Sequence, residues 1–518
     1  MKRRSWRTPV VITCAAALAI GLAACGDDDD SSSETTAGAA TTVAGVAPTT
    51  AAESTDTEAE STDTTEAEST DTTEADSSDA TTASGGGEFG LIDGVYKGGD
   101  GFELDPADCP EDWDPMQGIT DDSISFFSSM PKAGPLAGFG LIADGMNSYF
   151  TYINETNGGA AGHKLSLEVK DDGYAPDKTK SNVDEALGKN QYAGMLTVIG
   201  TPNNLAIWDT LNDECMPQLL NGTGYPGWGD ITNHPWTTGM QLDYASEAGL
   251  WAQWLQKEHP DKTKVAALTF NNDFGKSYVS GFNHFIEGTD IQLVDQEFHE
   301  PTAPDVTNQL TTIAASGAEV VLLETTGTFC IQAMAELEKN TTFNPIVIMS
   351  GTCGSLSQFF QPLIDQGLTG ADTYIIQYLK DVNDAQFADD DIVKLFHETA
   401  KAQGLDDKQT TYATGWIFAM FMEAIVKEAA TYEGGVNRGN IAVAARNITF
   451  QNPFALDGIK METNFAKDAY LFEGGQMAKY TIDPTDPTKL GSFVKEGELI
   501  DNNGKLGNYD DVVASGGG

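Results

Sequence analysis

Short apolar segments alternate with longer amphipathic segments from residue 123 to residue 349. The short segments have the length of buried or half-buried strands, and the longer ones have the periodicity of helices. Parallel strands need crossover connections of this length, so the alternation predicts an α/β fold of right-handed βαβ units. Because the pattern runs in two series that separate near residue 240, we expect two lobes, each with a doubly wound parallel sheet.

The predicted elements follow one another in chain order. Strands are expected at residues 123–128, 165–169, 194–199, 217–220, 265–270, 291–298, 319–323, 346–349 and 374–378. Helices are expected at residues 138–156, 176–189, 203–212, 244–258, 274–287, 306–315, 330–339, 390–401, 412–429 and 438–446. The last three helices follow both predicted sheets, which indicates that the chain returns to the first lobe before it ends in hairpin-like strands near residues 470–482.

We expect the chain to cross between the lobes three times and to form a hinge there. The expected crossings are residues 239–243, 377–381 and 450–456. The expected segments are lobe 1 at residues 120–241 and 378–452, lobe 2 at 242–377 and 453–495, an N-terminal extension at 89–119 and a C-terminal tail at 496–518.

Residues 1–25 have the organisation of an export signal. A basic start is followed by the uncharged apolar residues 10–24, which are too few to span a membrane. This segment ends in Leu22-Ala23-Ala24-Cys25-Gly26, which resembles a bacterial lipobox and predicts lipidation of Cys25. The alternative is an ordinary signal peptide with an incidental cysteine. The lipobox predicts an exported protein held by a lipid anchor at the bacterial cell membrane, in the periplasm or at the cell surface.

Residues 26–88 form an acidic, low-complexity segment in which residues 60–67 recur as residues 68–75. The segment has few apolar side chains whose burial could offset the entropy of ordering, so we expect it to be disordered. A flexible chain of about 60 residues has a mean reach of about 40–45 Å. We interpret it as a tether between the anchor and the lobes, although a tail without a spacing role is the alternative.

Charge and cysteine content restrict the partners and the compartment. The chain has 29 Lys and Arg against 78 Asp and Glu, a net charge of −49, which excludes nucleic acid as a partner.

Four cysteines follow the lipobox, Cys109, Cys215, Cys330 and Cys353, and they allow three pairings. Cys330 and Cys353 follow consecutive predicted strands, so we favour Cys330–Cys353 with Cys109–Cys215. No paired-cysteine or clustered histidine pattern accompanies them, so no metal site and no cofactor are predicted.

Polar loops follow the predicted strands of both lobes. In parallel sheets, ligands bind beyond the carboxyl ends of the strands. The loops at these ends are residues 129–135, 200–204, 221–225, 271–275, 324–328 and 350–354. The loops at 200–204 and 271–275 also lead into helices, whose free backbone N–H groups suit an anionic group, although ordinary helix capping explains the same residues.

Several of these segments carry a resemblance to a known family. Residues 129–140, SMPKAGPLAGFG, resemble the opening of the type I periplasmic binding proteins that bind leucine, isoleucine and valine. Residues 157–165, NGGAAGHKL, residues 194–200, GMLTVIG, and residues 271–275, NNDFG, continue the resemblance. It implies a substrate-binding lipoprotein of an ABC transporter, with permease and ATPase partners, whose two lobes close on a small molecule.

The resemblance also implies a set of ligand-binding residues. These are Phe139, Thr201, Asn203, Asn204, Asn221, Thr223, Tyr225, Phe274, Thr326 and Thr352. Amino-acid binders of this family place a carboxylate near the position of Thr352, and Glu324 is the nearest acid in this sequence. The departure leaves amides, ureas and organic acids open as ligands beside amino acids.

Other function classes are less well supported by the sequence. No G-x-S-x-G motif, complete P-loop or H-E-x-x-H motif is present, so we do not expect an enzyme. A ligand-sensing receptor domain that signals to a membrane kinase remains as an alternative, since the same two-lobed fold serves both roles. We expect a monomer.

Overall fold

The computed structural model describes residues 89–502. The predicted signal peptide, Cys25 and the linker at residues 26–88 lie outside the described residues, as do residues 503–518 of the predicted tail. The helices and strands below all belong to one unit of the chain, Asp79–Gly518. None of the described helices is long and apolar enough to cross a membrane.

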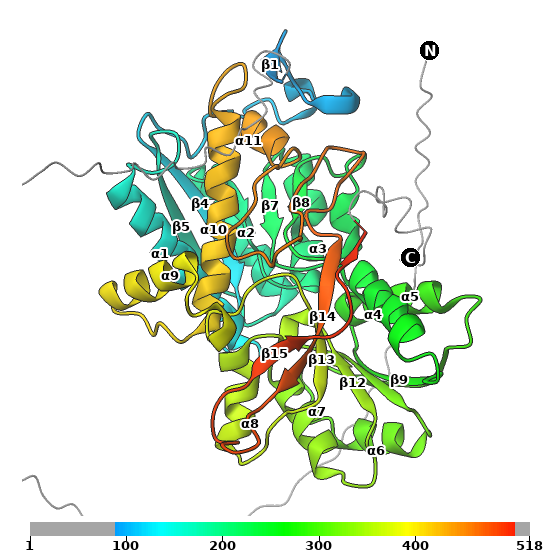
Figure 1. Cartoon of the computed structure of the whole chain (residues 1–518). Helices are drawn as coiled ribbons and strands as arrows, with labels where there is room; N and C mark the ends of the chain where they lie inside the picture. Colours follow the sequence, from blue (N-terminus) through cyan, green and yellow to red (C-terminus); the bar gives the residue numbers. More distant parts are fainter. Residues whose placement is uncertain (1–88, 503–518) are drawn as a thin grey trace, which may run out of the picture. The chain divides into compact units, whose positions relative to one another are not determined.

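The first sheet has five parallel strands in the order β5-β4-β6-β7-β8 (Figure 1). Their bounds are β4 Ser123–Met130, β5 Lys164–Asp171, β6 Gly194–Leu196, β7 Gln218–Asn221 and β8 Thr237–Gly239. In β4 both faces are buried over most of its length, as in a strand covered by helices on both sides. The strand order reverses at β4, so the carboxyl ends of β4 and β6 border a crevice suited to a ligand.

Six helices belong to this first lobe. Their bounds are α1 Leu141–Thr156, α2 Pro176–Lys189, α3 Thr201–Asp213, α9 Asp391–Ala402, α10 Thr410–Ala429 and α11 Arg438–Ala444. Helix α10 lies along α1 at a close crossing (Figure 1). A Cβ on Gly145 would lie 2.2 Å from the Tyr412 carbonyl oxygen, and one on Gly415 would lie 2.2 Å from that of Ile142. The two glycines therefore let the start of α10 lie beside the start of α1.

The second sheet is mixed. Its order is β10-β9-β11-β12-β13-β14-β15, and β16 pairs with β14. The bounds are β9 Lys264–Phe270, β10 Gln292–His299, β11 Val320–Glu324, β12 Ile346–Met349, β13 Thr373–Gln377, β14 Gly474–Thr481, β15 Ser492–Lys495 and β16 Ile500–Asp501. The first five strands are parallel, whereas β14 is antiparallel to its neighbours. The predicted tail thus begins inside this sheet, since β16 belongs to it.

Five helices accompany the second sheet. Their bounds are α4 Tyr244–Glu258, α5 Asp273–Ile286, α6 Thr307–Ala315, α7 Thr328–Lys339 and α8 Gln361–Asp365. Helix α4 begins at an N-cap, Asp243, whose carboxylate accepts a hydrogen bond from the Ser246 backbone N–H at 2.9 Å. The apolar face predicted for α4, with Leu250, Trp251 and Leu255, is fully buried.

The chain passes between the two lobes three times, between β8 and α4, between β13 and α9, and between α11 and β14. The second and third passages lie side by side. The Lys380 N–H donates to the Phe454 carbonyl at 2.8 Å, and the Leu456 N–H donates to the Tyr378 carbonyl at 3.0 Å. Beyond this point Tyr470 still donates a hydrogen bond to the Pro226 carbonyl in the first lobe. The return to lobe 2 is therefore completed later than the expected boundary at residue 452.

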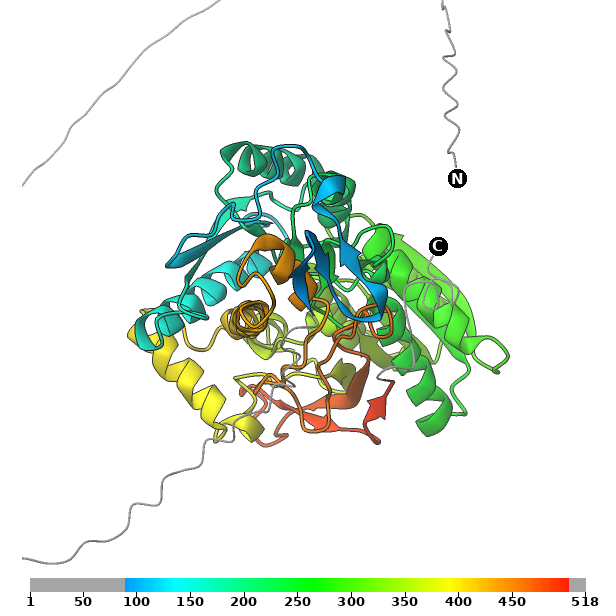
Figure 2. The same ribbon diagram turned by 90° about the horizontal axis from the view of Figure 1, so that it is seen from above.

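The N-terminal extension forms a small antiparallel sheet that the sequence did not predict. Its strands are β1 Gly90–Ile92, β2 Val95–Lys97 and β3 Glu103–Leu104, and β1 lies beside α11 (Figure 2). The disulfide Cys109–Cys215 attaches the extension to the first lobe. The buried Arg438 guanidinium donates to the Asp114 and Cys215 carbonyls at 3.1 and 3.0 Å. The extension is thus an integral part of lobe 1.

The α/β fold with two lobes is confirmed, and the predicted strands and helices are present with shifts of a few residues at their ends. Both favoured disulfides, Cys109–Cys215 and Cys330–Cys353, are also confirmed. Short elements without a strong apolar pattern, β8 and α8, were missed because their few residues carry no periodicity.

Candidate ligand-binding site

A cavity of about 170 Å³ lies between the two lobes and is lined by both of them. It borders the carboxyl ends of β6 in the first sheet and of β11, β12 and β13 in the second sheet. This is the place predicted for a ligand in paired parallel sheets. Most of the exposed wall area is apolar, and hydroxyl and amide groups interrupt it.

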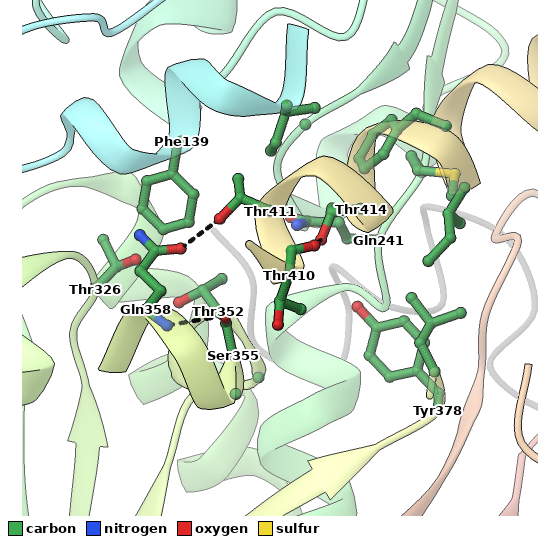
Figure 3. Close-up of a pocket in the computed structure, with 18 of the residues that line it drawn as sticks. Phe139, Gln241, Thr326, Thr352, Ser355, Gln358, Tyr378, Thr410, Thr411 and Thr414 are labelled. Carbon is green, nitrogen blue, oxygen red and sulfur yellow. Dashed lines mark hydrogen bonds between the residues drawn. The ribbon is translucent and has the colours of Figure 1, made fainter. Parts of the chain in front are cut away.

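The wall from lobe 1 combines the start of α1 with the start of α10. Phe139 and Ile142 supply apolar surface, and Thr410, Thr411 and Thr414 supply hydroxyl groups (Figure 3). The close glycine crossing of α1 and α10 brings these side chains together, although they are separated by about 270 residues of chain. The threonines were not predicted from the sequence, because α10 is a late helix and does not follow a predicted strand.

The wall from lobe 2 comes from the loops that follow β11 and β12. Thr326, Thr352, Ser355 and Gln358 line the cavity there (Figure 3). The Thr411 hydroxyl donates to the Gln358 side-chain oxygen at 2.9 Å, a contact between the lobes. A second contact between the lobes joins the Thr328 N–H to the Pro135 carbonyl at 3.3 Å. The lobes are therefore in contact beside the cavity at two places.

The crossing segments form the remaining wall. Tyr378, just after β13, points into the cavity, and burial raises its pKa well above the ordinary value. Gln241, in the first passage between the lobes, also lines it (Figure 3). Because residues of two passages border the cavity, an opening of the lobes would change its shape directly.

Two charged residues line the cavity, and both have protein partners. Asp381 accepts hydrogen bonds from the Leu356 N–H at 2.8 Å, the Asn383 N–H at 2.8 Å and the Thr410 hydroxyl at 3.0 Å. Burial raises the pKa of Asp381 to about 6. The Lys380 ammonium lies 2.6 Å from the Asp390 carboxylate. Both charged groups are therefore already engaged by other groups of the protein.

Four residues of the predicted site line this cavity: Phe139, Phe274, Thr326 and Thr352. The others, Thr201, Asn203, Asn204, Asn221, Thr223, Tyr225 and Glu324, do not line it, although Gly200 and Gly222 beside them do. Asn204 is bonded to the carbonyls of Val198 and Gly200 and to Gln218. Tyr225 packs against Trp208 and Trp228. The amides of Asn203 and Asn221 are buried without a hydrogen-bond partner among the described residues.

Thr201 and Thr223 lie behind the cavity wall, with their hydroxyl oxygens 2.5 Å apart. Tyr244, at the start of α4, lines the cavity and separates the two threonines from it. The Tyr244 hydroxyl donates to the Thr223 hydroxyl at 3.3 Å. From the sequence, Tyr244 was predicted only as part of a helix, because its contact with Thr223 exists only after the lobes are assembled.

Glu324 lies inside the second lobe, away from the cavity. It accepts a hydrogen bond from the Thr269 hydroxyl at 2.7 Å, and burial raises its pKa to about 8. A different acid, Glu247 of α4, lies next to the loop that contains Thr352. It accepts from the Gly351 N–H at 2.6 Å and from the Tyr278 hydroxyl at 2.7 Å. Glu247 was not predicted from the sequence as a residue near the site, because an acid in the first turn of a helix is common.

The fold and the cavity define a class: a two-lobed α/β protein that encloses a small molecule between its lobes. The chain belongs to the periplasmic binding protein family, whose pattern, described as "Periplasmic binding protein", matches residues 129–474. This confirms the resemblance found in the sequence. The family consists of binding proteins that act outside the cytoplasm.

Solved structures show the same fold. A branched-chain amino acid ABC transporter protein from Thermus thermophilus with bound valine is 15% identical with a TM-score of 0.63, over 74% of this chain and 97% of that one. A fatty acid ABC transporter substrate-binding protein from Thermomonospora curvata is 16% identical with a TM-score of 0.61, over 76% and 95%. A solute-binding protein from R. palustris in complex with benzoate is 14% identical with a TM-score of 0.57, over 72% and 96%. No curated protein matches the chain by sequence.

Proposed function

We propose that this protein is the solute-binding component of an ABC importer and carries a small organic solute between its lobes. The observation that carries the proposal is the cavity enclosed by both lobes, with hydrogen-bonding side chains from each. Similar structures bind valine, a fatty acid or benzoate according to their descriptions, which supports a small organic ligand. An amino acid, an amide, a urea or an organic acid are the ligand classes considered from the sequence.

The mechanism is a population shift between open and closed lobes. The contacts Thr411–Gln358 and Thr328–Pro135 join the lobes in the closed arrangement and would break on opening. A ligand in the cavity adds contacts to both walls at once, so it binds the closed form more tightly. The closed form would then present a defined surface to the permease.

The anchor belongs to the same proposal. Lipidation of Cys25 would hold the protein at the outer face of a membrane, and the acidic segment at residues 26–88 would let the lobes reach the permease. A Cys25→Ser variant should lose incorporation of labelled fatty acid and appear in the soluble fraction. Retention of the fatty-acid label in this variant would contradict lipidation at Cys25. It would not bear on the proposed solute binding.

Binding is tested with a thermal-shift screen of amino acids, amides, ureas and small carboxylates on the full chain, followed by calorimetry and small-angle scattering. We expect at least one solute to raise the melting temperature and to make the protein more compact. Phe139→Ala should weaken that binding on the order of 10-fold, because it removes apolar contact area from the wall. Phe102→Ala, in the extension, is the matched control and should leave the affinity unchanged.

A screen in which no solute closes the lobes would contradict the proposal. Co-purification with a permease and an ATPase would support transport. Co-purification with a membrane kinase would instead support the sensing role.

A further inference from the structure

The start of α3, beside Thr201 and Thr223, is a position suited to an anion, and Tyr244 separates it from the cavity. Helix α3 begins there after Gly200, and its first turn has backbone N–H groups without helical partners. The hydroxyls of Thr201 and Thr223 face the same place. Such a set of donors would bind the carboxylate of a ligand if the ligand could reach it.

Tyr244 occupies this position with its own side chain. Its hydroxyl lies within hydrogen-bonding distance of the Thr223 hydroxyl at 3.3 Å and of the Gln241 side-chain oxygen at 3.4 Å, and its backbone N–H donates to the Gly224 carbonyl at 2.7 Å. Gly224 leaves the room for the ring, because a Cβ at this residue would lie 2.8 Å from two ring carbons of Tyr244. The phenol group thus occupies the space beside the Thr223 hydroxyl in which a ligand carboxylate would otherwise lie.

Packing holds Tyr244 in place. Its ring stacks on Tyr278 with centroids 4.8 Å apart, and Tyr278 stacks on Trp251 at 5.0 Å with the planes only 6° apart. Phe274 meets the other side of Tyr244 edge-on at 4.6 Å. Tyr244 is 3% exposed, and ring contacts with Tyr278 and Phe274 hold its side chain in this position.

The charged groups next to the cavity are also engaged. Asp381, Lys380 and Glu247 each have the hydrogen-bonding or ionic partners described above. A ligand carboxylate in this cavity would lose its hydration and find no free cation, because Lys380 is paired with Asp390. A ligand ammonium would find Asp381 already accepting three hydrogen bonds from the protein. The size of the cavity, about 170 Å³, is close to the roughly 150 Å³ of a cavity that holds benzene.

Building on the proposed solute-binding function, we propose that the ligand is uncharged and about the size of one ring, with one or two hydroxyl or amide groups. Phe139 and Ile142 bury its apolar body. The hydroxyls of the threonines on α10 and the amides of Gln241 and Gln358 bind its polar groups. The Tyr244 phenol occupies the position in which the carboxylate of an anionic ligand would lie.

The test compares neutral compounds with charged compounds of the same shape. Calorimetry on the full chain at pH 7 would measure benzamide against benzoate, and benzyl alcohol against benzylammonium. We expect the neutral member of a pair to bind at least 10-fold more tightly. Equal or tighter binding of benzoate or benzylammonium would overturn the inference, and so would the failure of both neutral compounds to bind.

A variant tests the role of Tyr244 itself. Tyr244→Ala should open the space beside Thr201 and Thr223 and reduce the preference for benzamide over benzoate at least 10-fold. Tyr432→Ala removes another buried tyrosine, remote from the cavity, and should leave the preference unchanged. An unchanged preference in folded Tyr244→Ala would contradict the role of this residue, and if that variant does not fold, the comparison on the unaltered chain decides.

The outcomes separate this inference from the proposed function. If a charged solute closes the lobes in the scattering experiment, the solute-binding function stands and the inference fails. If no solute of either kind closes them, the proposed function fails as well.

Discussion

At the scale of single residues, burial controls the charge of acids near the cavity. Glu247 is 2% exposed, and burial raises its pKa to about 8, opposed by hydrogen bonds from Tyr278 and the Gly351 N–H. At neutral pH the protonated form is therefore favoured, which reduces the negative charge beneath the loop of Thr352. A neutral hydrogen-bonding group at this place fits a ligand without an ammonium group.

This pKa predicts a pH dependence of stability. Because the folded pKa of Glu247 lies above the unfolded value, the folded state binds more protons between about pH 4.5 and pH 8, and the free energy of unfolding falls as pH rises through this range. Glu247→Gln should remove this contribution. Between pH 5 and pH 8 the free energy of unfolding of the variant should therefore rise, relative to that of the unaltered chain, by on the order of 1–4 kcal/mol.

Urea denaturation at the two pH values measures this difference. The matched control is Glu155→Gln on the exposed face of α1, which should keep the original slope. A Glu247→Gln variant with the same pH slope as the unaltered chain would show that this carboxyl is ionised in the fold.

Phe139 and Phe274 illustrate two different roles of aromatic residues at the cavity. Phe139 is half-buried in the 3-10 turn that directly precedes α1, and the centroid of its ring lies 6.5 Å from that of Phe359. Phe274 is 3% exposed and packs against Phe270, Tyr244 and Tyr278. Truncation of Phe274 therefore removes core packing as well as cavity wall, so only Phe139 separates binding from stability.

At the scale of elements, the crossing of α1 and α10 positions the threonine side of the cavity. The crossing requires backbone contact, which Gly145 and Gly415 allow. Any side chain at these positions would push the helices apart and move the first turn of α10.

Gly415→Ala tests this crossing. Its Cβ would lie 2.2 Å from the Ile142 carbonyl and 2.6 Å from the Met146 N, so we expect a loss of about 1–3 kcal/mol in the free energy of unfolding and weaker ligand binding. Gly188→Ala in α2 is the control, because nothing lies within 4 Å of its Cβ and helix propensity favours alanine by up to about 1 kcal/mol. Equal effects in urea denaturation would contradict a special role for the crossing.

At the scale of the whole molecule, two disulfides act over different lengths of chain. Cys109–Cys215 spans 106 residues and joins the extension to lobe 1, whereas Cys330–Cys353 spans 23 residues within lobe 2. In the chain-entropy view, a longer closed loop restricts the unfolded chain more.

Removal of each disulfide by paired Cys→Ser substitution should therefore have unequal effects. We expect a loss of about 2–5 kcal/mol for Cys109–Cys215 and a loss about 1 kcal/mol smaller for Cys330–Cys353. Calorimetric or urea unfolding measures both. A larger loss for the shorter loop would show that native packing, rather than loop closure, dominates.

The order of strands and helices and the division into two lobes followed from the sequence, because apolar periodicity and strand-end loops are local properties. Phe139, Thr326 and Thr352 were predicted from the resemblance to the family, and Thr326 and Thr352 also lie in loops that follow recognisable strands. Tyr244 in front of Thr201 and Thr223, Glu247 beneath Gly351 and the threonines of α10 at the cavity depended on the tertiary structure. Each of these contacts joins residues that are distant in the chain, so only the packing of helices and lobes brings them together and selects which polar groups face the ligand.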